Sequence, residues 1–285
     1  MKKLKKKGII FNSIIYIVLI ILMIIFEGFS LFSSFEYLLS DRTFQKAKVI
    51  NNPIYIIGVD ETSLKHYGTW ENWSREKISL TIDKLNSDAN NKPACIAIDV
   101  DLFSERSALA DDALIASIEN SDNVILVSSF KFNTKIDKYE DGTFSKSNYI
   151  EEYEVPFESL YNACYSVGHA NVELDNDGTV RHAFGSIKYN GELVNSFDYE
   201  IYKLYCLKNG LEATSDFGRD EFRYYIDFSG EVKDYYATSI YNFLETDYSS
   251  SGFRNGIVLI GAYASGMQDN YDTSITKETQ MYGVE

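Results

Sequence analysis

The segment PACIAIDVD (residues 93–101) is a short apolar run that closes with the acidic sequence Asp-Val-Asp. A run of this length without polar alternation is typical of a strand buried on both faces of a parallel sheet. Three other segments share this character: PIYIIGVD (53–60), NVILVSSF (123–130) and GIVLIGA (256–262). Buried strands of this kind predict an α/β fold.

Helical patterns lie between these strands. SREKISLTIDKL (74–85) and DDALIASIEN (111–120) place apolar residues at helical spacing, and the same holds for SFDYEIYKLYCLKNG (196–210) and TSIYNFLE (238–245). Strands that alternate with helices favour right-handed crossovers and helices on both faces of the sheet. We therefore expect a mixed, mainly parallel sheet, with a further strand in EFRYYIDFSG (221–230) and a long exposed loop or hairpin over residues 131–155.

The amino-terminal segment, residues 9–26, is an apolar stretch of 18 residues without a charge. A helix that crosses a hydrocarbon layer of ~30 Å needs about 20 apolar residues, with ~17 as the lower limit. A cleaved signal peptide has a shorter apolar region and a small-residue cleavage site, and no clear site of this kind follows here. We therefore expect an uncleaved transmembrane helix rather than a signal peptide or a buried soluble helix.

Five lysines precede this segment, at positions 2, 3, 5, 6 and 7. The positive-inside rule places such a flank in the cytoplasm, and thus places everything after about residue 30 outside the cell. The expected layout is a cytoplasmic basic tail (1–8), a transmembrane helix (9–26), a helical connector (27–52) and one extracytoplasmic domain (53–285).

Composition excludes several classes of function. Five of the 27 basic residues lie among the first seven positions, so the rest of the chain carries 22 basic against 42 acidic side chains. A body this acidic repels phosphate backbones, and we expect no nucleic-acid partner. Cys95, Cys164 and Cys206 lack the C-x-x-C spacing of zinc and redox sites, and no disulfide is required. No G-x-G-x-x-G or P-loop sequence is present, so no cofactor is predicted.

Three aspartates, Asp60, Asp99 and Asp101, lie at the carboxyl ends of predicted strands. Ligands bind at the carboxyl ends of the strands in open α/β sheets, and carboxylates gathered there can hold Mg²⁺ or Ca²⁺. The competing interpretation is that they cap the helices or turns that follow. The D-x-D spacing also occurs in aspartate-nucleophile phosphatases, but Leu102-Phe103 stands where those enzymes carry a small hydroxyl residue.

The stretch GHANVELDNDGTVRHA (168–183) has two competing interpretations. Counted from Glu173, Asp175, Asp177 and Gly178 fit a calcium-binding loop, but its twelfth position is Phe184, which has no oxygen ligand. Residues on either side alternate between apolar and polar, with Asp177-Gly178 as turn residues. We therefore favour two antiparallel strands joined by an acidic turn.

Taken together, these segments resemble a known family. The motifs are DRTF (41–44), IIGVDETSLKHYGTWENWSRE (56–76), AIDVDLFSE (97–105), DDALIASI (111–118), GHANVELDNDGTVRHA (168–183), YYIDFSGE (224–231), GIVLIGAYASGMQDNYDTS (256–274) and MYGVE (281–285). In their order and spacing they are similar to the second class of CHASE domains, from about residue 38 to the end. The chain departs from that family in lacking prolines around Trp70 and Trp73, and in having Ser274 where a proline often follows threonine.

The resemblance implies an extracellular sensory module of a bacterial adenylate cyclase, diguanylate cyclase or sensor histidine kinase. It implies that further membrane helices and an output domain follow, and it offers no catalytic residues for this chain. It gives no ligand, so the expected partner is an unidentified small molecule or ion. A homodimer is expected by analogy with the family alone.

We therefore predict a membrane-bound, extracytoplasmic sensory domain that is not itself an enzyme. The ligand-binding candidates are Asp60, Glu61, Arg75, Asp99, Asp101, His169, Asn171, Arg181 and Asp269. Arg75 and Arg181 could balance the acidic edge or hold an anionic ligand. A structural role for His169 is the competing interpretation.

Two other functions stay open. A metal-dependent extracellular hydrolase would use Asp60, Asp99 and Asp101, although we predict no metal site. An envelope module that binds other proteins would need no ligand.

Overall fold

A computed structural model describes residues 14–25, 31–43, 52–139, 143–214, 223–276 and 279–285. The chain divides into two compact units, residues 1–47 and residues 48–285. Each unit is described by itself.

The first unit contains a helix over residues 14–25 and helix α2 (Leu31–Thr43). Every residue from 14 to 25 is a large hydrophobic one with an exposed side chain. Within the described ranges, no helix has the length and apolarity that a membrane crossing requires. The predicted span of residues 9–26 includes residues 9–13 and 26, which lie outside the described ranges. So do residues 27–30 and 44–51 of the predicted connector.

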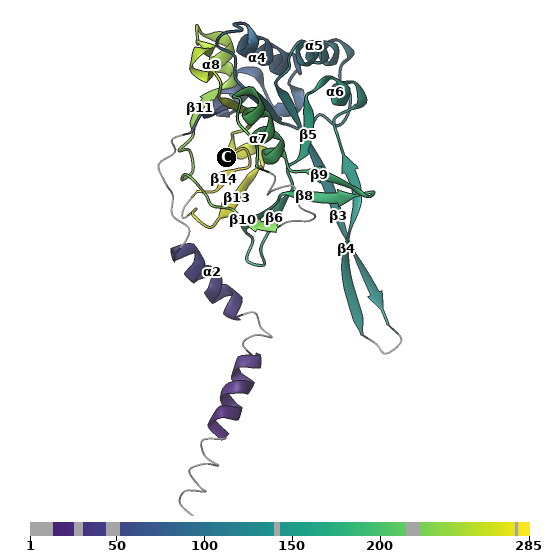
Figure 1. Ribbon diagram of the computed structural model, residues 1–285, viewed down its shortest axis with the longest axis vertical. Coiled ribbons are helices and arrows are strands. Elements are labelled where there is room, and N and C mark those ends of the chain that lie inside the picture. The colour runs from purple at the N-terminus through teal and green to yellow at the C-terminus, as the bar shows by residue number, and fades with distance from the viewer. Residues whose placement is uncertain (1–13, 26–30, 44–51, 140–142, 215–222, 277–278) are drawn as a thin grey trace, which may run out of the picture. The chain divides into compact units, whose positions relative to one another are not determined.

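The second unit is built on a sheet that has seven strands in the described part of the chain (Figure 1). Its strands are β1 (Ile54–Val59), β2 (Cys95–Asp99), β3 (Val124–Lys138), β4 (Phe144–Glu154), β5 (Ser166–His169), β11 (Tyr236–Ser239) and β12 (Ile257–Ala262). The order is β11-β1-β12-β2-β3, and both β4 and β5 pair with β3. All pairings are parallel except that of β3 with β4, which confirms the predicted mainly parallel sheet.

Strand β12 is late in sequence but central in the sheet. It pairs with β1 on one side, where Gly58 faces Gly261, and with β2 on the other, where Asp99 faces Gly261. This insertion brings the loop after Ala262 to the carboxyl end of β2. Segments that are far apart in the sequence therefore meet at one edge of the sheet.

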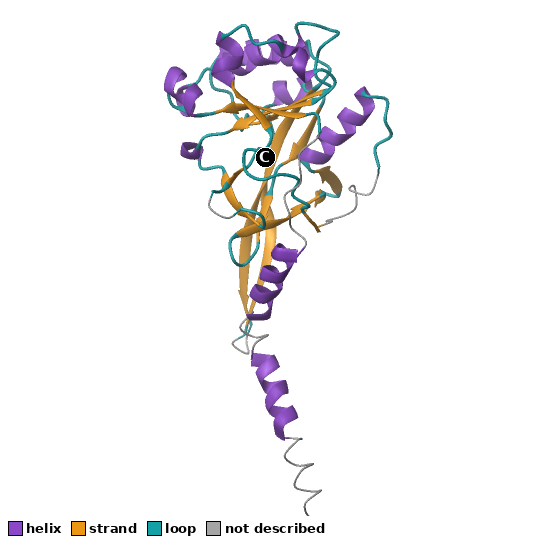
Figure 2. Cartoon of the chain, turned by 90° about the vertical axis from the view of Figure 1, so that its left-hand side faces the viewer, coloured by secondary structure: helices purple, strands orange, loops and turns teal. Residues whose placement is uncertain are grey.

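Helices cover both faces of this sheet, as the sequence predicts (Figure 2). One face carries α3 (Glu61–Tyr67), α4 (Glu76–Asn86), α5 (Ala108–Glu119), α6 (Glu158–Ala163) and α8 (Ile240–Glu245). The other face carries α7 (Phe197–Lys208) and the segment of residues 281–285. Alternation within β2 explains the two layers, because Ile96 and Ile98 enter the larger core while Cys95 and Ala97 pack with α7.

The second unit also contains a smaller sheet. Its strands are β6 (Val172–Leu174), β7 (Thr179–Phe184), β10 (Arg223–Tyr225), β13 (Asn270–Thr273) and β14 (Met281–Tyr282). Strands β6 and β7 pair antiparallel across the turn that contains Gly178, whose φ is 82°. This confirms the predicted hairpin. Strands β8 (Ser186–Tyr189) and β9 (Glu192–Asn195) form another hairpin, with Asn190 and Gly191 both at positive φ in the turn.

Strands β3 and β4 form a long two-stranded ribbon that extends beyond the sheet (Figure 1). This is the hairpin that the polar segment 131–155 predicted. Large hydrophobic side chains are exposed along it, namely Phe132, Ile136, Tyr139, Phe144 and Tyr149.

Candidate functional site

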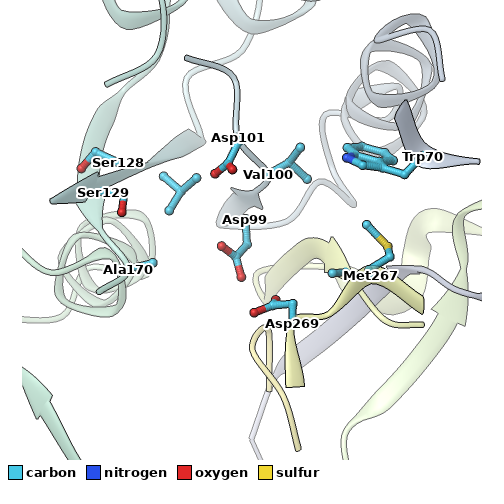
Figure 3. Close-up of a pocket in the computed structure, with 11 residues that line it drawn as sticks. Trp70, Asp99, Val100, Asp101, Ser128, Ser129, Ala170, Met267 and Asp269 are labelled. Atoms are coloured by element: carbon cyan, nitrogen blue, oxygen red, sulfur yellow. The ribbon is translucent and has the colours of Figure 1, made fainter. Parts of the chain in front are cut away.

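A pocket of about 370 Å³ lies at the carboxyl edge of the main sheet (Figure 3). Its walls are Trp70, Asp99, Val100, Asp101, Val127, Ser128, Ser129, Ala170, Ala262, Met267 and Asp269. We call this cavity the carboxylate pocket, after the three aspartates that line it.

The fold explains why these residues meet. Asp99 is the last residue of β2, and Asp101 follows it by two positions. Ser128 and Ser129 come from the neighbouring strand β3, where the apolar part of that strand ends. Because β12 lies between β1 and β2, the loop that follows it carries Asp269 to the same edge.

Three carboxylates share this pocket, and their pKa values reflect it. Burial, followed by the charges of Asp269 and Asp101, raises the pKa of Asp99 to about 7. Burial and the charge of Glu154 raise the pKa of Asp101, although Arg106 opposes them. Burial also raises the pKa of Asp269. A hydrogen bond from Tyr271 lowers this pKa, and the charge of Asp101 raises it. Deprotonating all three aspartates therefore requires like charges to approach one another in a poorly solvated space.

In the part of the chain that the structure describes, no Lys, Arg or His lines the pocket. The carboxylate of Asp99 has no hydrogen-bond or ion-pair partner within the described ranges. In the view of Figure 3, the three carboxylates lie between Ser128 and Ser129 on one side and Trp70 and Met267 on the other. The pocket thus combines unpaired negative charge with an aromatic and a thioether wall.

Asp60 and Glu61 do not line this pocket. Asp60 caps helix α3 and accepts hydrogen bonds from the Ser63 amide (2.8 Å), the Ser63 hydroxyl (2.7 Å) and the Ser239 hydroxyl (2.8 Å). Glu61 accepts a hydrogen bond from the amide of Ser265 at 3.1 Å, which ties α3 to the loop that carries Met267. The strand-end aspartate after β1 is therefore a cap, as the competing interpretation held, and Asp269 joins Asp99 and Asp101 instead.

The two candidate arginines are buried in other places. Arg75 Nη1 lies 2.7 Å from Asp111 Oδ1, and Arg75 Nη2 donates to the Ser104 carbonyl at 2.6 Å. Arg181 Nη1 lies 3.1 Å from Asp175 Oδ2 and 2.9 Å from Asp177 Oδ1. Both guanidinium groups are thus engaged within the fold.

His169 and Asn171 flank Ala170, which lines the pocket. Neither ring nitrogen of His169 has a hydrogen-bond partner in the described part of the chain. Burial lowers the pKa of this histidine to about 4, although the negative charge of Asp198 raises it. His169 is therefore neutral at pH 7. Asn171 donates to the Phe130 carbonyl at 2.7 Å and accepts from the Phe130 amide at 2.8 Å. This pair of bonds holds the chain beside the pocket.

The acidic turn of the β6–β7 hairpin is occupied by basic side chains. Asp175 is contacted by Arg181, by His182 at 3.0 Å and by Arg223 at 3.0 Å. More widely, no group of three or more His, Cys, Asp or Glu among the described residues is arranged to hold a metal ion. The metal-dependent alternative also needs Asp60, whose Oδ1 accepts three hydrogen bonds.

Sequence reasoning missed several wall residues, above all Trp70, Ser128, Ser129 and Met267. The serines could have been found, because they end the apolar run of residues 123–130 just as Asp99 ends its own run. No local signal marks Trp70 and Met267, since their place depends on loops that fold back over the sheet edge.

Comparison with known proteins gives the family. The model of the CHASE2 domain matches residues 16–285, which is most of the chain. No curated protein and no solved structure matches the sequence. The chain therefore belongs to the CHASE2 family, whose members are extracellular sensory domains of signalling proteins.

Proposed function

We propose that the chain is the ligand-binding part of a membrane-anchored receptor, and that the carboxylate pocket binds a small molecule with an ammonium or other cationic group. One observation carries this proposal: Asp99, Asp101 and Asp269 converge on a cavity that no Lys, Arg or His of the described residues lines.

A cationic ligand suits the pocket for two physical reasons. An opposite charge within about 4–6 Å favours the ionised carboxylate, so a bound cation would offset the repulsion that raises the pKa of Asp99. The face of Trp70 also attracts cations, and Met267 adds adaptable apolar contact. The volume of about 370 Å³ lies within the usual range for small-molecule sites.

The binding proposal is tested by thermal unfolding of the full chain in detergent. The probes are ammonium, 1,4-diaminobutane, 1,5-diaminopentane and spermidine, with 1,4-butanediol as the uncharged match for the first diamine. At least one amine is expected to raise the melting temperature by several degrees, because a ligand at ~100 times its Kd stabilises the native state by about 2.7 kcal/mol. The diol is expected to have no effect.

Matched variants locate the effect in the pocket. Asp99→Asn and Asp269→Asn each remove one pocket charge, whereas Asp112→Asn removes one exposed charge from α5. The first two variants are expected to abolish the stabilisation by amines and the third to retain it. Equal stabilisation of all three variants, or none of the wild type by any amine, would rule out the pocket as an amine site.

Membrane anchoring by residues 9–26 is part of the same proposal. It is supported by the uncharged stretch and its lysine flank, and by the exposure of every large hydrophobic side chain from 14 to 25. Exposed apolar surface of this extent is costly in water and favourable in lipid. Reporter fusions after residue 50 and protease added to intact cells test it. Reporter activity confined to the cytosol, together with protection of residues 53–285, would contradict it.

A sensor must also bind its ligand better in one conformation than in another, since otherwise binding transmits nothing. The pocket suits this requirement because Trp70, Met267 and Asp269 come from segments outside the strands of the main sheet, and different arrangements of the domain can bring these segments closer to the strand ends or further from them.

A protein-interaction role is the second candidate, and the β3–β4 ribbon favours it. Isolated two-stranded ribbons are only marginally stable in water, and this one exposes Phe132, Ile136 and Phe144. If copies of the chain associate through it, replacing these three residues by serine reduces association in sedimentation velocity. A wild-type chain that is monomeric at all concentrations would exclude self-association through the ribbon.

A further inference from the structure

We propose that residues 281–285, which we call the reporter segment, respond to the state of the carboxylate pocket, and that Asp269 is the residue that couples the two. The proposal rests on the proposed function and adds to it the way in which the state of the pocket changes the rest of the domain. The coupling itself is a property of the chain without a ligand and is tested without one.

Asp269 is shared between the pocket and the reporter segment. Its carboxylate lines the pocket, while its backbone carbonyl accepts a hydrogen bond from the amide of Gly283 at 2.9 Å. A Cβ atom built on Gly283 would lie 2.4 Å from Asp269 Oδ1 and 2.5 Å from Oδ2. The carboxylate therefore rests directly against the backbone of Gly283, at a distance that only glycine permits.

A second contact runs from the segment to the neighbouring strand. A Cβ on Gly261 would lie 2.9 Å from Val284 Cγ2 and 3.2 Å from Asp99 Cβ. Gly261 is paired with Asp99 across β12 and β2. The side chain of Val284 thus reaches the sheet beside the base of Asp99. Asp269 therefore contacts the reporter segment directly, and Gly261 lies between Asp99 and Val284 of that segment.

The reporter segment is held by packing, by a short strand pairing and by hydrogen bonds, among them those from the Tyr282 amide to Glu285 Oε2 at 3.4 Å and from the Gly283 amide to the Asp269 carbonyl at 2.9 Å. Tyr282 and Val284 are buried against Ile56 on the face of the sheet that α7 shares, and Met281–Tyr282 pair with β13 over two residues. The Glu285 carboxylate accepts hydrogen bonds from the amide of Lys233 at 2.7 Å and the hydroxyl of Tyr263 at 3.1 Å. A short element of this kind can open without unfolding the sheet, because local opening needs only its own contacts to break.

The charge in the pocket, acting against the hydrogen bond from Tyr271, biases where the Asp269 carboxylate lies. A cation between Asp99 and Asp269 attracts both carboxylates, and drawing the Asp269 carboxylate inward removes it from Gly283. Without a cation, repulsion from Asp99 and Asp101 favours the position against Gly283. Because coupling is reciprocal, a change imposed at Gly283 must in turn alter the pocket.

The first arm of the test measures amide hydrogen exchange in the full chain. Asp269→Ala removes the carboxylate that packs against Gly283, and exchange at residues 282–285 is expected to quicken about tenfold or more as the segment opens more often. Asp101→Ala removes the same charge from the same pocket without a contact to the segment, and we expect less than about a twofold change there. Equal exchange in the two variants would overturn the proposal.

The second arm works in the opposite direction. Gly283→Ala forces the Asp269 carboxylate to move, which the end of a side chain can do without unfolding the protein. Because the charge of Asp269 contributes to the pKa of Asp99, the midpoint of Asp99 in a carboxyl ¹³C NMR titration is expected to shift by about half a unit or more. Gly266→Ala adds the same methyl group on the loop before Met267, where it meets no atom within 4 Å, and serves as the matched control.

The double variant makes the test specific. If the new methyl group at position 283 acts through the carboxylate, Asp269→Ala removes the melting-temperature loss that Gly283→Ala causes, and the two changes are not additive. Additive losses, or an unshifted Asp99 midpoint in Gly283→Ala, would overturn the coupling. Either result would leave amine binding to the pocket unaffected, so failure of this inference and failure of the proposed function are distinguishable.

Discussion

Arg75 Nη1 lies 2.7 Å from Asp111 Oδ1, and both side chains are only 5% exposed. The carboxylate also accepts the backbone amides of Arg106 and Ser107 at 2.8 Å and 3.0 Å. Burial raises the pKa of Asp111, but these donors and Arg75 outweigh it and lower the pKa below its usual value. An arginine that the sequence offers as a ligand contact is thus a structural tie between α4 and α5.

Arg75→Ala is therefore expected to destabilise the domain by about 3–5 kcal/mol, because it leaves a buried carboxylate without its ion-pair partner. Urea unfolding of the full chain measures this. Lys92→Ala is the control, since the Lys92–Asp122 pair is exposed and such pairs contribute about 0–1 kcal/mol. Equal losses in the two variants would show that Arg75 is not a structural residue of this kind.

Asp99 gives the domain a distinctive dependence on pH. Its folded pKa is raised to about 7, so between about pH 4 and pH 7 the native state holds a proton that the unfolded state has released. Stability from this group is therefore present at low pH and is lost as the pH rises towards 7. Asp99→Asn is expected to increase the free energy of unfolding at pH 8 by on the order of 2 kcal/mol, and to have much less effect at pH 5. A variant that is less stable than the wild type at pH 8 would contradict this.

Calcium is not expected to bind the acidic turn of the β6–β7 hairpin. The side chain of Asp175 is 1% exposed and is contacted by Arg181, His182 and Arg223, so its oxygens already have donors. Added Ca²⁺ should leave the melting temperature unchanged, and Asp175→Ala should lower the free energy of unfolding by about 3 kcal/mol or more because the buried Arg181 loses one of its carboxylate partners. Stabilisation by Ca²⁺ that disappears in Asp175→Ala would restore the calcium-loop hypothesis.

The outer part of the β3–β4 ribbon should be dispensable for folding. Among the described strands β4 pairs only with β3, and the register joins Phe132 directly to Ile150. Replacing residues 133–149 by Asn-Gly, the preferred two-residue hairpin turn, is expected to shift the melting temperature by no more than about 2 °C. Loss of cooperative unfolding would show that the ribbon belongs to the folding unit.

Much of the fold could be predicted from the sequence, because the information is local. The apolar run that ends at Asp99 needs no partner to identify it as a buried strand, and Asp177-Gly178 defines its turn by backbone geometry alone. The position of β12 between β1 and β2 could not be predicted in this way. Strand β12 begins at Ile257, 158 residues after β2 ends at Asp99, and its place depends on which strand edges are unpaired when it joins the sheet. The pattern within a single strand contains no information about that.

The same limit applies to the site. Asp99 and Asp101 were predicted as strand-end carboxylates, and they line the pocket, but the same reasoning also selected Asp60, which the Ser63 and Ser239 hydroxyls hold as a helix cap. A position at the end of a strand predicts at which edge of the sheet the side chain lies. It does not predict whether neighbouring hydroxyl groups already donate hydrogen bonds to that side chain.

The most direct test of cation binding is a carboxyl ¹³C NMR titration of Asp99 in the full chain, with and without the amine that stabilises it most. We predict that the bound amine lowers the pKa of Asp99 from about 7 by a unit or more, because a nearby positive charge favours the carboxylate. An Asp99 pKa that no amine changes, or that 1,4-butanediol lowers equally, would contradict the account.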